Sequence, residues 1–328
     1  MSNHNVKRLA VLTSGGDAPG MNACIRACVR YALSKGYEVY GVGRGYVGLL
    51  EDDIFPMDHA SVTNIVQLGG TIIRTGRSKE FACIEGTGKA LENLKRRGIE
   101  NLIVIGGDGS FHGVQRMYDH FGFNAVGIPG TIDNDMGYTD YTIGFDTACN
   151  TVLSAILSLR DTIASHDRIM VLEVMGRNCG DIALWSGLAG GAQTIVCPEE
   201  TSDVNKLADE VNDIIVSRHR QSALVVVAEG CKEIEEPLMK RLREVTGRTV
   251  NFVNLSYVQR GGSPTMLDRV LAARFAVRAV DLIDEGKGGR AVGIDGRKII
   301  DVPIADSLYG EDKEFNHQLY KIANIISQ

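Results

Sequence analysis

The sequence contains no long apolar run and no block of basic residues. Of its 328 residues 44% are hydrophobic, yet no stretch approaches the roughly 18 to 20 apolar residues that cross a bilayer. The opening MSNHNVKRLA lacks the apolar centre of a secretory signal. The net charge is −6, and basic residues are not interleaved with aromatic ones. These absences predict a cytoplasmic protein that binds small molecules, and they disfavour nucleic acid and membrane as partners.

Paired cysteines are also lacking. The seven cysteines form no CxxC pair and no histidine cluster at metal-ligand spacing, and some, such as Cys24 and Cys28, lie on helical stretches. We therefore expect reduced thiols, mostly in the core. The sequence GxxxxGK[ST] is absent as well, because GTGKA at 86–90 has no hydroxyl residue after the lysine. A nucleotide kinase of that type is disfavoured.

What the sequence does contain is a series of short, continuous apolar runs separated by helix-like segments. The runs cover 8–13, 38–42, 101–107, 124–130, 168–176, 194–197 and 223–230. The helix-like segments cover 20–35, 86–97, 109–120, 146–163, 203–219 and 264–285. Continuous apolar strands alternating with helices are typical of parallel sheets covered on both faces. The sequence thus predicts an α/β doubly wound protein, and its length favours two lobes.

Two glycine-rich turns follow predicted strands. LTSGGDAPGMN (12–22) places Gly15 and Gly16 before the first helix, where backbone N–H groups can approach an anion. VIGGDGSFHG (104–113) repeats the arrangement, with Asp108 and Ser110 at the start of the next helix. These two residues cap that helix in the simplest interpretation, but a cap needs only one of them. A carboxylate beside a glycine turn is also a plausible Mg²⁺ ligand.

A third glycine pattern matches a dinucleotide-binding motif but lacks the sequence context that this motif requires. GRGYVG (43–48) matches GxGxxG after a strand, which raises a dinucleotide-binding hypothesis. The following LLEDDIFPMD is interrupted by Pro56 and cannot form the long helix that this motif requires.

VGIPGTIDND (126–135) leads from an apolar strand to two aspartates, Asp133 and Asp135. In an extended segment both would point the same way, and their repulsion is costly unless a metal, an arginine or a bound hydroxyl shares the site. Such pairs are candidates for proton abstraction or metal binding. The alternative is a solvated Asp-Asn-Asp turn.

Together, LTSGGDAPGMN, VIGGDGS, PGTIDND, TIGFDTA, LEVMGRNCGD and VQRGGSPT resemble the bacterial ATP-dependent 6-phosphofructokinase family. The resemblance covers nearly the whole chain and is weakest after about residue 295. It implies two α/β lobes with parallel or mixed sheets and the site between them. The larger, ATP-binding lobe would cover 1–143 plus 259–309, and the smaller, sugar-phosphate-binding lobe 144–258 plus 310–328.

The resemblance also implies a reaction, the ATP-dependent phosphorylation of fructose 6-phosphate at its 1-hydroxyl in glycolysis, with Mg²⁺ as cofactor. Asp133 would be the general base, helped by Asp135, while Arg77 and Arg177 stabilise the transferring phosphoryl group. The residues implied for ATP are Gly16, Arg77, Ser78, Gly107, Asp108, Gly109 and Ser110, with Asp108 facing Mg²⁺. Those implied for catalysis or the sugar are Thr131, Asp133, Arg168, Met175, Gly176, Arg177, Glu229, Asn251, Tyr257 and Arg260.

Two further features follow from the resemblance. In the family, substrate arginines cross a subunit boundary, so the site would be shared in a homotetramer. The pyrophosphate-dependent branch typically has Asp at the position of Gly109 and Lys at that of Gly130. Because this chain keeps both glycines, ATP is the expected donor.

The chain departs from the family at the predicted site for the 6-phosphate. Tyr257 stands where a histidine is usual and Asn251 where an arginine is usual, while Arg168 and Arg260 are kept. This leaves three interpretations: a 6-phosphofructokinase with weakened phosphate binding, a related kinase with a different acceptor, or a catalytically silent regulatory relative.

The effector site implied by the resemblance is altered too. The residues that match it are Arg26, Arg30, Arg160, Arg218 and Arg220. His59 replaces a usual arginine, and Gln193 replaces a glutamate that helps hold the Mg²⁺ of the effector. A neutral amide binds a divalent cation less well than a carboxylate, which predicts weak activation by ADP. Helical arginines such as Arg26 and Arg30 also often form a solvated face.

Overall fold

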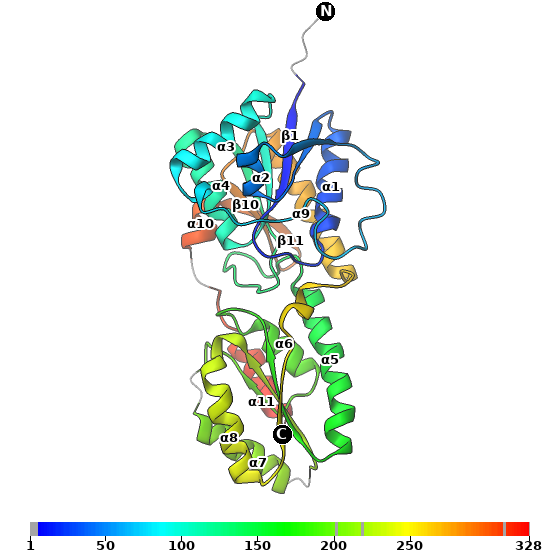
Figure 1. The fold of residues 1–328 in the computed structure, drawn as a ribbon, viewed down its shortest axis with the longest axis vertical. Helices are drawn as coiled ribbons and strands as arrows, with labels where there is room; N and C mark the ends of the chain where they lie inside the picture. Colours follow the sequence, from blue (N-terminus) through cyan, green and yellow to red (C-terminus); the bar gives the residue numbers. More distant parts are fainter. Residues whose placement is uncertain (1–5, 201–202, 218–219, 311–312, 328) are drawn as a thin grey trace, which may run out of the picture. The chain divides into compact units, whose positions relative to one another are not determined.

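The structure is a computed structural model that describes residues 6–200, 203–217, 220–310 and 313–327. It divides into two compact units (Figure 1). Unit 1 comprises Met1–Ile132, Met136–Asp146 and Arg260–Lys313. Unit 2 comprises Asp133–Asp135, Thr147–Gln259 and Glu314–Gln328. Each unit is an α/β structure, as the sequence predicts.

Unit 1 is built on a seven-stranded sheet with the order β11-β10-β5-β4-β1-β2-β3. Its strands are β1 (Arg8–Thr13), β2 (Glu38–Val42), β3 (Ile54–Met57), β4 (Asn101–Gly106), β5 (Asn124–Pro129), β10 (Arg290–Asp295) and β11 (Lys298–Pro303). The five central strands are parallel, whereas the edge strands β3 and β11 run antiparallel to their neighbours. The carboxyl ends of β1, β4 and β5 therefore meet at one edge of the sheet.

Helices cover both faces of this sheet (Figure 1). They are α1 (Met21–Ser34), α2 (Tyr46–Glu51), α3 (Ile84–Arg96), α4 (Asp108–Phe121), α9 (Met266–Asp284) and α10 (Ile304–Tyr309). Helices α1 and α9 pack against each other on one face. On the other, residues of α2, α3, α4 and α10 form a core cluster that includes Phe111 and Leu94, both fully buried.

Unit 2 contains a four-stranded parallel sheet with the order β7-β8-β6-β9. The strands are β6 (Ile169–Val174), β7 (Thr194–Val196), β8 (Ala223–Ala228) and β9 (Val250–Asn254). The helices are α5 (Phe145–Ser165, entering from unit 1), α6 (Asp181–Ala189), α7 (Val204–Ser217), α8 (Glu235–Thr246) and α11 (His317–Ile326). Helices α7 and α8 share a core cluster with one face of the sheet, while α11 contacts α6 and β7.

The GRGYVG pattern and the cysteines behave as the sequence predicts. The GRGYVG pattern leads into the six-residue helix α2 and then into β3, which carries Pro56, so it opens no long helix. All seven cysteines lie in the described part of the chain and are free, and five of them are buried. Among the described residues, no helix is long and apolar enough to cross a membrane.

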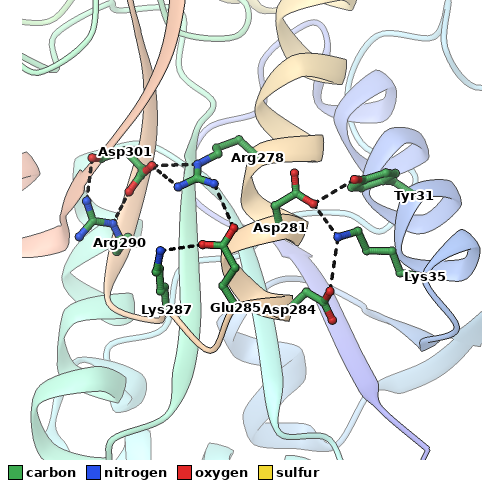
Figure 2. Close-up of polar contacts among 9 residues, drawn as sticks. All are labelled: Tyr31, Lys35, Arg278, Asp281, Asp284, Glu285, Lys287, Arg290 and Asp301. Carbon is green, nitrogen blue, oxygen red and sulfur yellow. Dashed lines mark hydrogen bonds and ion pairs between the residues drawn. The ribbon is translucent and has the colours of Figure 1, made fainter.

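Ion pairs tie α9 to its neighbours in unit 1 (Figure 2). Asp301 on β11 accepts hydrogen bonds from Arg278 on α9, at 2.6 and 2.8 Å, and from Arg290 on β10. On the α1 side, Lys35 Nζ lies 2.7 Å from Asp281 Oδ1. Burial raises the pKa of Asp301, but the hydrogen bonds from the two arginines outweigh it and leave the pKa below its usual value.

We expect Asp301→Asn to lower the free energy of unfolding at pH 7 by about 2 kcal/mol, because two guanidinium groups lose a charged partner. Since the folded-state pKa of Asp301 is depressed, its contribution is complete above the unfolded pKa near 4 and is lost as the pH falls further. Urea unfolding from pH 7 to pH 3 measures both effects. Glu285→Gln is the control, because this exposed carboxylate lies 3.4 Å from Arg278 and is screened by solvent, so its loss should leave the free energy of unfolding nearly unchanged.

Candidate active site

The glycine-rich turns of unit 1 are brought together by the sheet. Ser14 N, directly after β1, donates to Ile105 O of β4, and Gly130 N, directly after β5, donates to Gly106 O. Because these parallel strands are neighbours, the turn after β1, the start of α4 and the segment after β5 lie side by side at the carboxyl edge of the sheet.

Glycine at 106 is required by close packing between two of these turns. A Cβ at Gly106 would lie 2.5 Å from both Ser14 O and Ser110 Oγ. Gly15 has a φ of 87°, a conformation that side chains rarely adopt. Packing at the end of β4 therefore requires Gly106, and the backbone of the turn after β1 requires Gly15, before any ligand is considered.

The start of α4 carries no side-chain cap. The sequence expectation that Asp108 and Ser110 cap this helix is wrong: Gly107 is the N-cap residue and no side chain accepts a hydrogen bond there. Asp108 is half-exposed, Ser110 is buried, and a Cβ added at Gly109 would meet nothing within 4 Å. Uncapped N–H groups beside open space suit an anionic ligand.

Asp108 also fits the Mg²⁺ that accompanies ATP in the family resemblance. Among the described residues, no group of three or more His, Cys, Asp or Glu side chains could hold a metal alone. Mg²⁺ needs no such group, since it is usually held by one or two carboxylates, substrate phosphates and water. The half-exposed Asp108 carboxylate next to an anion-accepting helix start matches that mode of binding.

Three more residues of unit 1 that the sequence singles out, Thr131, Arg260 and Gly130, lie at this edge. Thr131 is buried, and its side chain is 3.4 Å from a Cβ built on Gly107. Arg260 lies against the turn after β1: its Nη1 donates to Asp17 O at 3.4 Å and would be 2.6 Å from a Cβ on Gly16. Arg77 is exposed, while Ser78 Oγ accepts a hydrogen bond from Phe81 N. A Cβ on Gly130 would lie 3.0 Å from Ile105 Cγ2.

Asp133 and Asp135 converge on one guanidinium in unit 2. Arg177 Nη2 lies 3.6 Å from Asp133 Oδ2, and Arg177 Nη1 lies 3.5 Å from Asp135 Oδ2. The expectation of an extended segment is wrong, because Asn134 between the aspartates has a left-handed φ of 53°. The alternative of a solvated turn does not hold either, since Asp133 and Asn134 are each only 2% exposed. The arginine offsets the repulsion between the carboxylates.

Three polar contacts hold this arrangement, and some come from residues that the sequence did not single out. Asn134 donates to Asp181 at the start of α6, at 2.8 Å. Arg177 N donates to Glu229 Oε1 directly after β8. Met175 N, directly after β6, donates to the buried Gln259 Oε1 at 3.0 Å. Gln259 lies inside the VQRGGSPT motif. Its position next to the predicted residue Arg260 is the feature of the sequence that could have identified it.

Next to Met175, Gly176 has a φ of 136°, and a Cβ there would clash with Cys179 O at 2.3 Å. Glycine is therefore required where the chain leaves β6 and turns toward Arg177.

Arg168 and Asn251 lie at the opposite end of the same sheet. Arg168 directly precedes β6, and Asn251 near the start of β9 pairs with Met170. Met175 follows the other end of β6, so about 20 Å of strand separates the two sets. Tyr257 is 78% exposed in the short helix Ser256–Arg260. Within one chain, the structure does not bring Arg168 and Asn251 to the Asp133–Arg177 pair.

The predicted effector residues fall in both units. Arg26 and Arg30 lie on α1, whereas Arg160 lies on α5 and donates to Gly190 O at 2.7 Å. Burial, followed by the charge of Arg220, lowers the pKa of Arg160. Arg218 lies outside the described residues.

Gln193, the altered metal position of the effector site, is buried. Its Oε1 accepts from Leu224 N at 2.8 Å and its Nε2 donates to Gly191 O at 3.2 Å. His59 is exposed. The Gln193 amide is thus already engaged by the backbone.

Fold and strand-end residues together define a class: a two-unit α/β protein with polar groups at the carboxyl ends of its parallel strands, where such proteins bind ligands. Comparison with known proteins then gives the family. The model described as Phosphofructokinase matches residues 8–283. The ATP-dependent 6-phosphofructokinases of Clostridium botulinum strain Hall and Clostridioides difficile strain 630 are 53% and 50% identical, over 98% of this chain and 100% of each relative. The chain belongs to the phosphofructokinase family.

Solved structures agree with this assignment. Phosphofructokinase from Saccharomyces cerevisiae superposes with a TM-score of 0.84 at 35% identity, covering 98% of this chain. The match covers 46% of the yeast chain, so this chain spans about half its length. A pyrophosphate-dependent phosphofructokinase from Marinobacter aquaeolei, 21% identical with a TM-score of 0.84, covers 95% of this chain and 86% of its own and shows the fold alone.

Proposed function

We propose that the protein transfers the γ-phosphoryl group of ATP to the 1-hydroxyl of fructose 6-phosphate, giving fructose 1,6-bisphosphate and ADP in glycolysis. Two clostridial relatives at 50% identity or more carry the name ATP-dependent 6-phosphofructokinase over the whole length of the match. We assign ATP to unit 1 and the sugar phosphate to unit 2. As these are metabolites of the cytoplasm, we place the enzyme there.

The observation that carries the proposal is the pairing of the buried Asp133 carboxylate with the exposed Arg177 guanidinium. The guanidinium and burial hold Asp133 Oδ2 at a fixed place, and in this proposal the Asp133 carboxylate takes the proton of the 1-hydroxyl. Phosphoryl transfer depends mainly on positioning and charge stabilisation. Arg177, with Arg77, supplies planar cationic donors for the oxygens of the transferring group.

ATP is assigned to the uncapped start of α4 and the turn after β1. The backbone N–H groups of 107–109 and the dipole of the fourteen-residue helix favour the phosphates. Asp108 would hold Mg²⁺, which when bound neutralises charge on the β- and γ-phosphates. Thr131 and Ser110 would line the same edge.

A homotetramer is supported by the distance between the two sets of sugar-binding residues. Arg168 and Asn251 lie at the amino end of β6 and β9, while Asp133, Arg177 and Glu229 lie at the carboxyl end. One sugar phosphate cannot reach both sets in one chain. A second copy supplying Arg168 and Asn251 would complete the site, and sedimentation measures the assembly directly.

The function is tested with the purified protein, ATP, Mg²⁺ and a panel of phosphorylated and unphosphorylated sugars. We expect ADP release to depend on fructose 6-phosphate above the other acceptors, and the product to carry the new phosphate at carbon 1. Turnover with another sugar at a higher kcat/KM would give the enzyme a different acceptor. No turnover with any sugar would make the protein a silent relative.

Asn251→Arg should lower the KM for fructose 6-phosphate about ten- to a hundredfold, because a hydrogen bond involving a charged group contributes about 1.5–3 kcal/mol. The kcat should stay the same, since the residue contacts no reacting atom in this proposal. Steady-state kinetics measure the change. Asn205→Arg adds the same charge to the exposed start of α7 and should leave KM unchanged. Unchanged kinetics in Asn251→Arg would remove this residue from the site.

ADP should activate the enzyme weakly or not at all. The Gln193 oxygen that would face the effector Mg²⁺ accepts a backbone hydrogen bond, and Arg160 is engaged by Gly190 O. Rates at subsaturating fructose 6-phosphate, measured over a range of ADP concentrations at fixed ATP, give the result. Strong activation at micromolar ADP contradicts this prediction.

A further inference from the structure

The turn that joins β6 to α6 contacts every residue of the segment 133–135. Arg177 in this turn lies near both aspartates of the segment. Two residues further along contact Asn134 between them: Asn134 Nδ2 donates to Asp181 Oδ2 at 2.8 Å, and Cys179 Sγ lies 4.0 Å from Asn134 O. All of these residues belong to unit 2, so the contacts form within one compact unit.

Asn134 benefits from such contacts because of its backbone conformation. Its φ of 53° lies in the left-handed region, which is unfavourable for residues other than glycine. Asparagine visits this region more readily than most residues, but it also populates the ordinary regions. A change in this φ would redirect the chain between Asp133 and Asp135 and move both carboxylates relative to Arg177. A hydrogen bond to the Asn134 side chain therefore helps to fix where Asp133 lies.

Asp181 provides this hydrogen bond from a buried position. It is the first residue of α6 and is 5% exposed. An acidic residue in a first helical turn complements the helix dipole, which is the simplest interpretation of Asp181. That benefit does not require burial, and burial of a carboxylate is costly unless it is hydrogen-bonded. The contact with Asn134 gives this carboxylate a partner and links the start of α6 to the aspartate segment.

The start of α6 is itself held by the chain that follows β7. Gly180 N, directly before Asp181, donates to Glu199 Oε1 at 2.8 Å, and Cys197 Sγ lies 3.7 Å from Gly180 O. Burial raises the pKa of Glu199, and the charge of Asp181 acts in the same direction, because the two carboxylates lie near each other. Asp181 therefore holds Asn134 from an anchored position.

We infer that Asp181 is a positioning residue for the phosphoryl transfer: its carboxylate holds the side chain of Asn134 and thereby keeps Asp133 where it accepts the proton of the sugar hydroxyl. The inference rests on the proposed function, which gives Asp133 the role of base. Asp181 acts through Asn134 and not on the reacting atoms. A displacement of about 1 Å in such a site can cost about a hundredfold in rate, so the effect is measurable.

Steady-state kinetics of Asp181→Leu and Asp181→Asn in the full-length protein test the inference. Leucine has the same branched shape but accepts no hydrogen bond, so kcat should fall about a hundredfold while the KM for ATP stays unchanged. Asparagine still offers an oxygen to Asn134, so Asp181→Asn should keep kcat within about tenfold of the wild type. Circular dichroism shows whether each variant is folded. Equal losses in both variants would mean that the charge of Asp181 matters and not its hydrogen bond, which contradicts the inference.

A double-mutant cycle with Asn134→Gly tests whether Asp181 acts through Asn134. Glycine adopts the left-handed φ without strain but offers no side chain to Asp181, so kcat should fall about tenfold or more. In this background Asp181→Leu should cost less than about threefold more, because the contact that it removes is already absent. Losses that multiply would show that Asp181 acts elsewhere. If Asp181→Leu does not fold, Asn134→Gly alone decides, since a wild-type kcat in that variant refutes the inference.

Amide hydrogen exchange gives a readout that needs no turnover. The amides of 133–135 should exchange about tenfold faster in Asp181→Leu than in the wild type, because the segment loses a hydrogen bond to a charged group. Glu236→Leu is the matched control: it removes an exposed carboxylate from the first turn of α8 and should change neither exchange nor kcat. A wild type that phosphorylates no sugar would overturn the proposed function and the inference with it. An active wild type whose kcat and exchange are both unchanged by Asp181→Leu would overturn the inference alone.

Discussion

Asp133→Asn should reduce kcat about 10³-fold, the middle of the range in which a general base typically contributes. The amide has the shape of the carboxylate but cannot accept the proton of the sugar hydroxyl. Arg177 keeps a charged partner, because Asp135 Oδ2 remains 3.5 Å from its Nη1, so the fold around the site should survive. Steady-state kinetics together with circular dichroism separate lost chemistry from lost structure.

Asp135→Asn is the matched comparison for this prediction. It removes a carboxylate from the same guanidinium, but its side chain is 21% exposed, against 2% for Asp133. We expect a loss of about tenfold, because Asp135 acts on charge rather than as the base. Equal losses in both variants would mean that total charge matters and that Asp133 is not a proton acceptor.

The central sheet of each unit was predictable because its strands are buried on both faces. RLAVLT, NLIVIG and ALVVVA read as continuous apolar runs and form β1, β4 and β8. The edges were not predictable on this basis. Strand β3 carries Pro56, and β11 is only partly buried, so neither shows the pattern of a central strand. The antiparallel direction of β3 and β11 depends on how these strands pair with their neighbours in the folded protein, and the local sequence does not encode this pairing.

The candidate site was predictable in its residues and not in its geometry. The spacing of Asp133 and Asp135 identified them as a candidate pair. However, both face Arg177 because Asn134 between them adopts a left-handed conformation, and not because the segment is extended. Asparagine tolerates this conformation better than most residues, so the Asn between the two aspartates could have indicated a turn at this position. The separation of Arg168 from Met175 by the length of β6 depends on strand register, which a single sequence does not reveal.

Gly109→Asp should lower kcat/KM for ATP about a hundredfold while leaving the fold intact or slightly more stable. Gly109 is the second residue of α4, and a Cβ there meets nothing within 4 Å, so a side chain enters open space without a clash. Aspartate in a first helical turn is favoured by the helix dipole, and glycine is a poor helix former. The same charge, fixed beside Asp108, would repel the phosphates that this helix start is proposed to bind.

Two further variants decide whether charge or volume causes the loss. Gly109→Ala should raise Tm and change ATP kinetics less than threefold, because the added methyl group meets open space and helix propensity improves by up to about 1 kcal/mol. Gly109→Asn matches aspartate in size without its charge and should lose under about tenfold. If asparagine is as damaging as aspartate, the nucleotide occupies the space beside Gly109 and volume is the cause. If neither variant changes ATP kinetics, the start of α4 does not bind the phosphates, and the assignment of ATP to this edge of unit 1 is wrong.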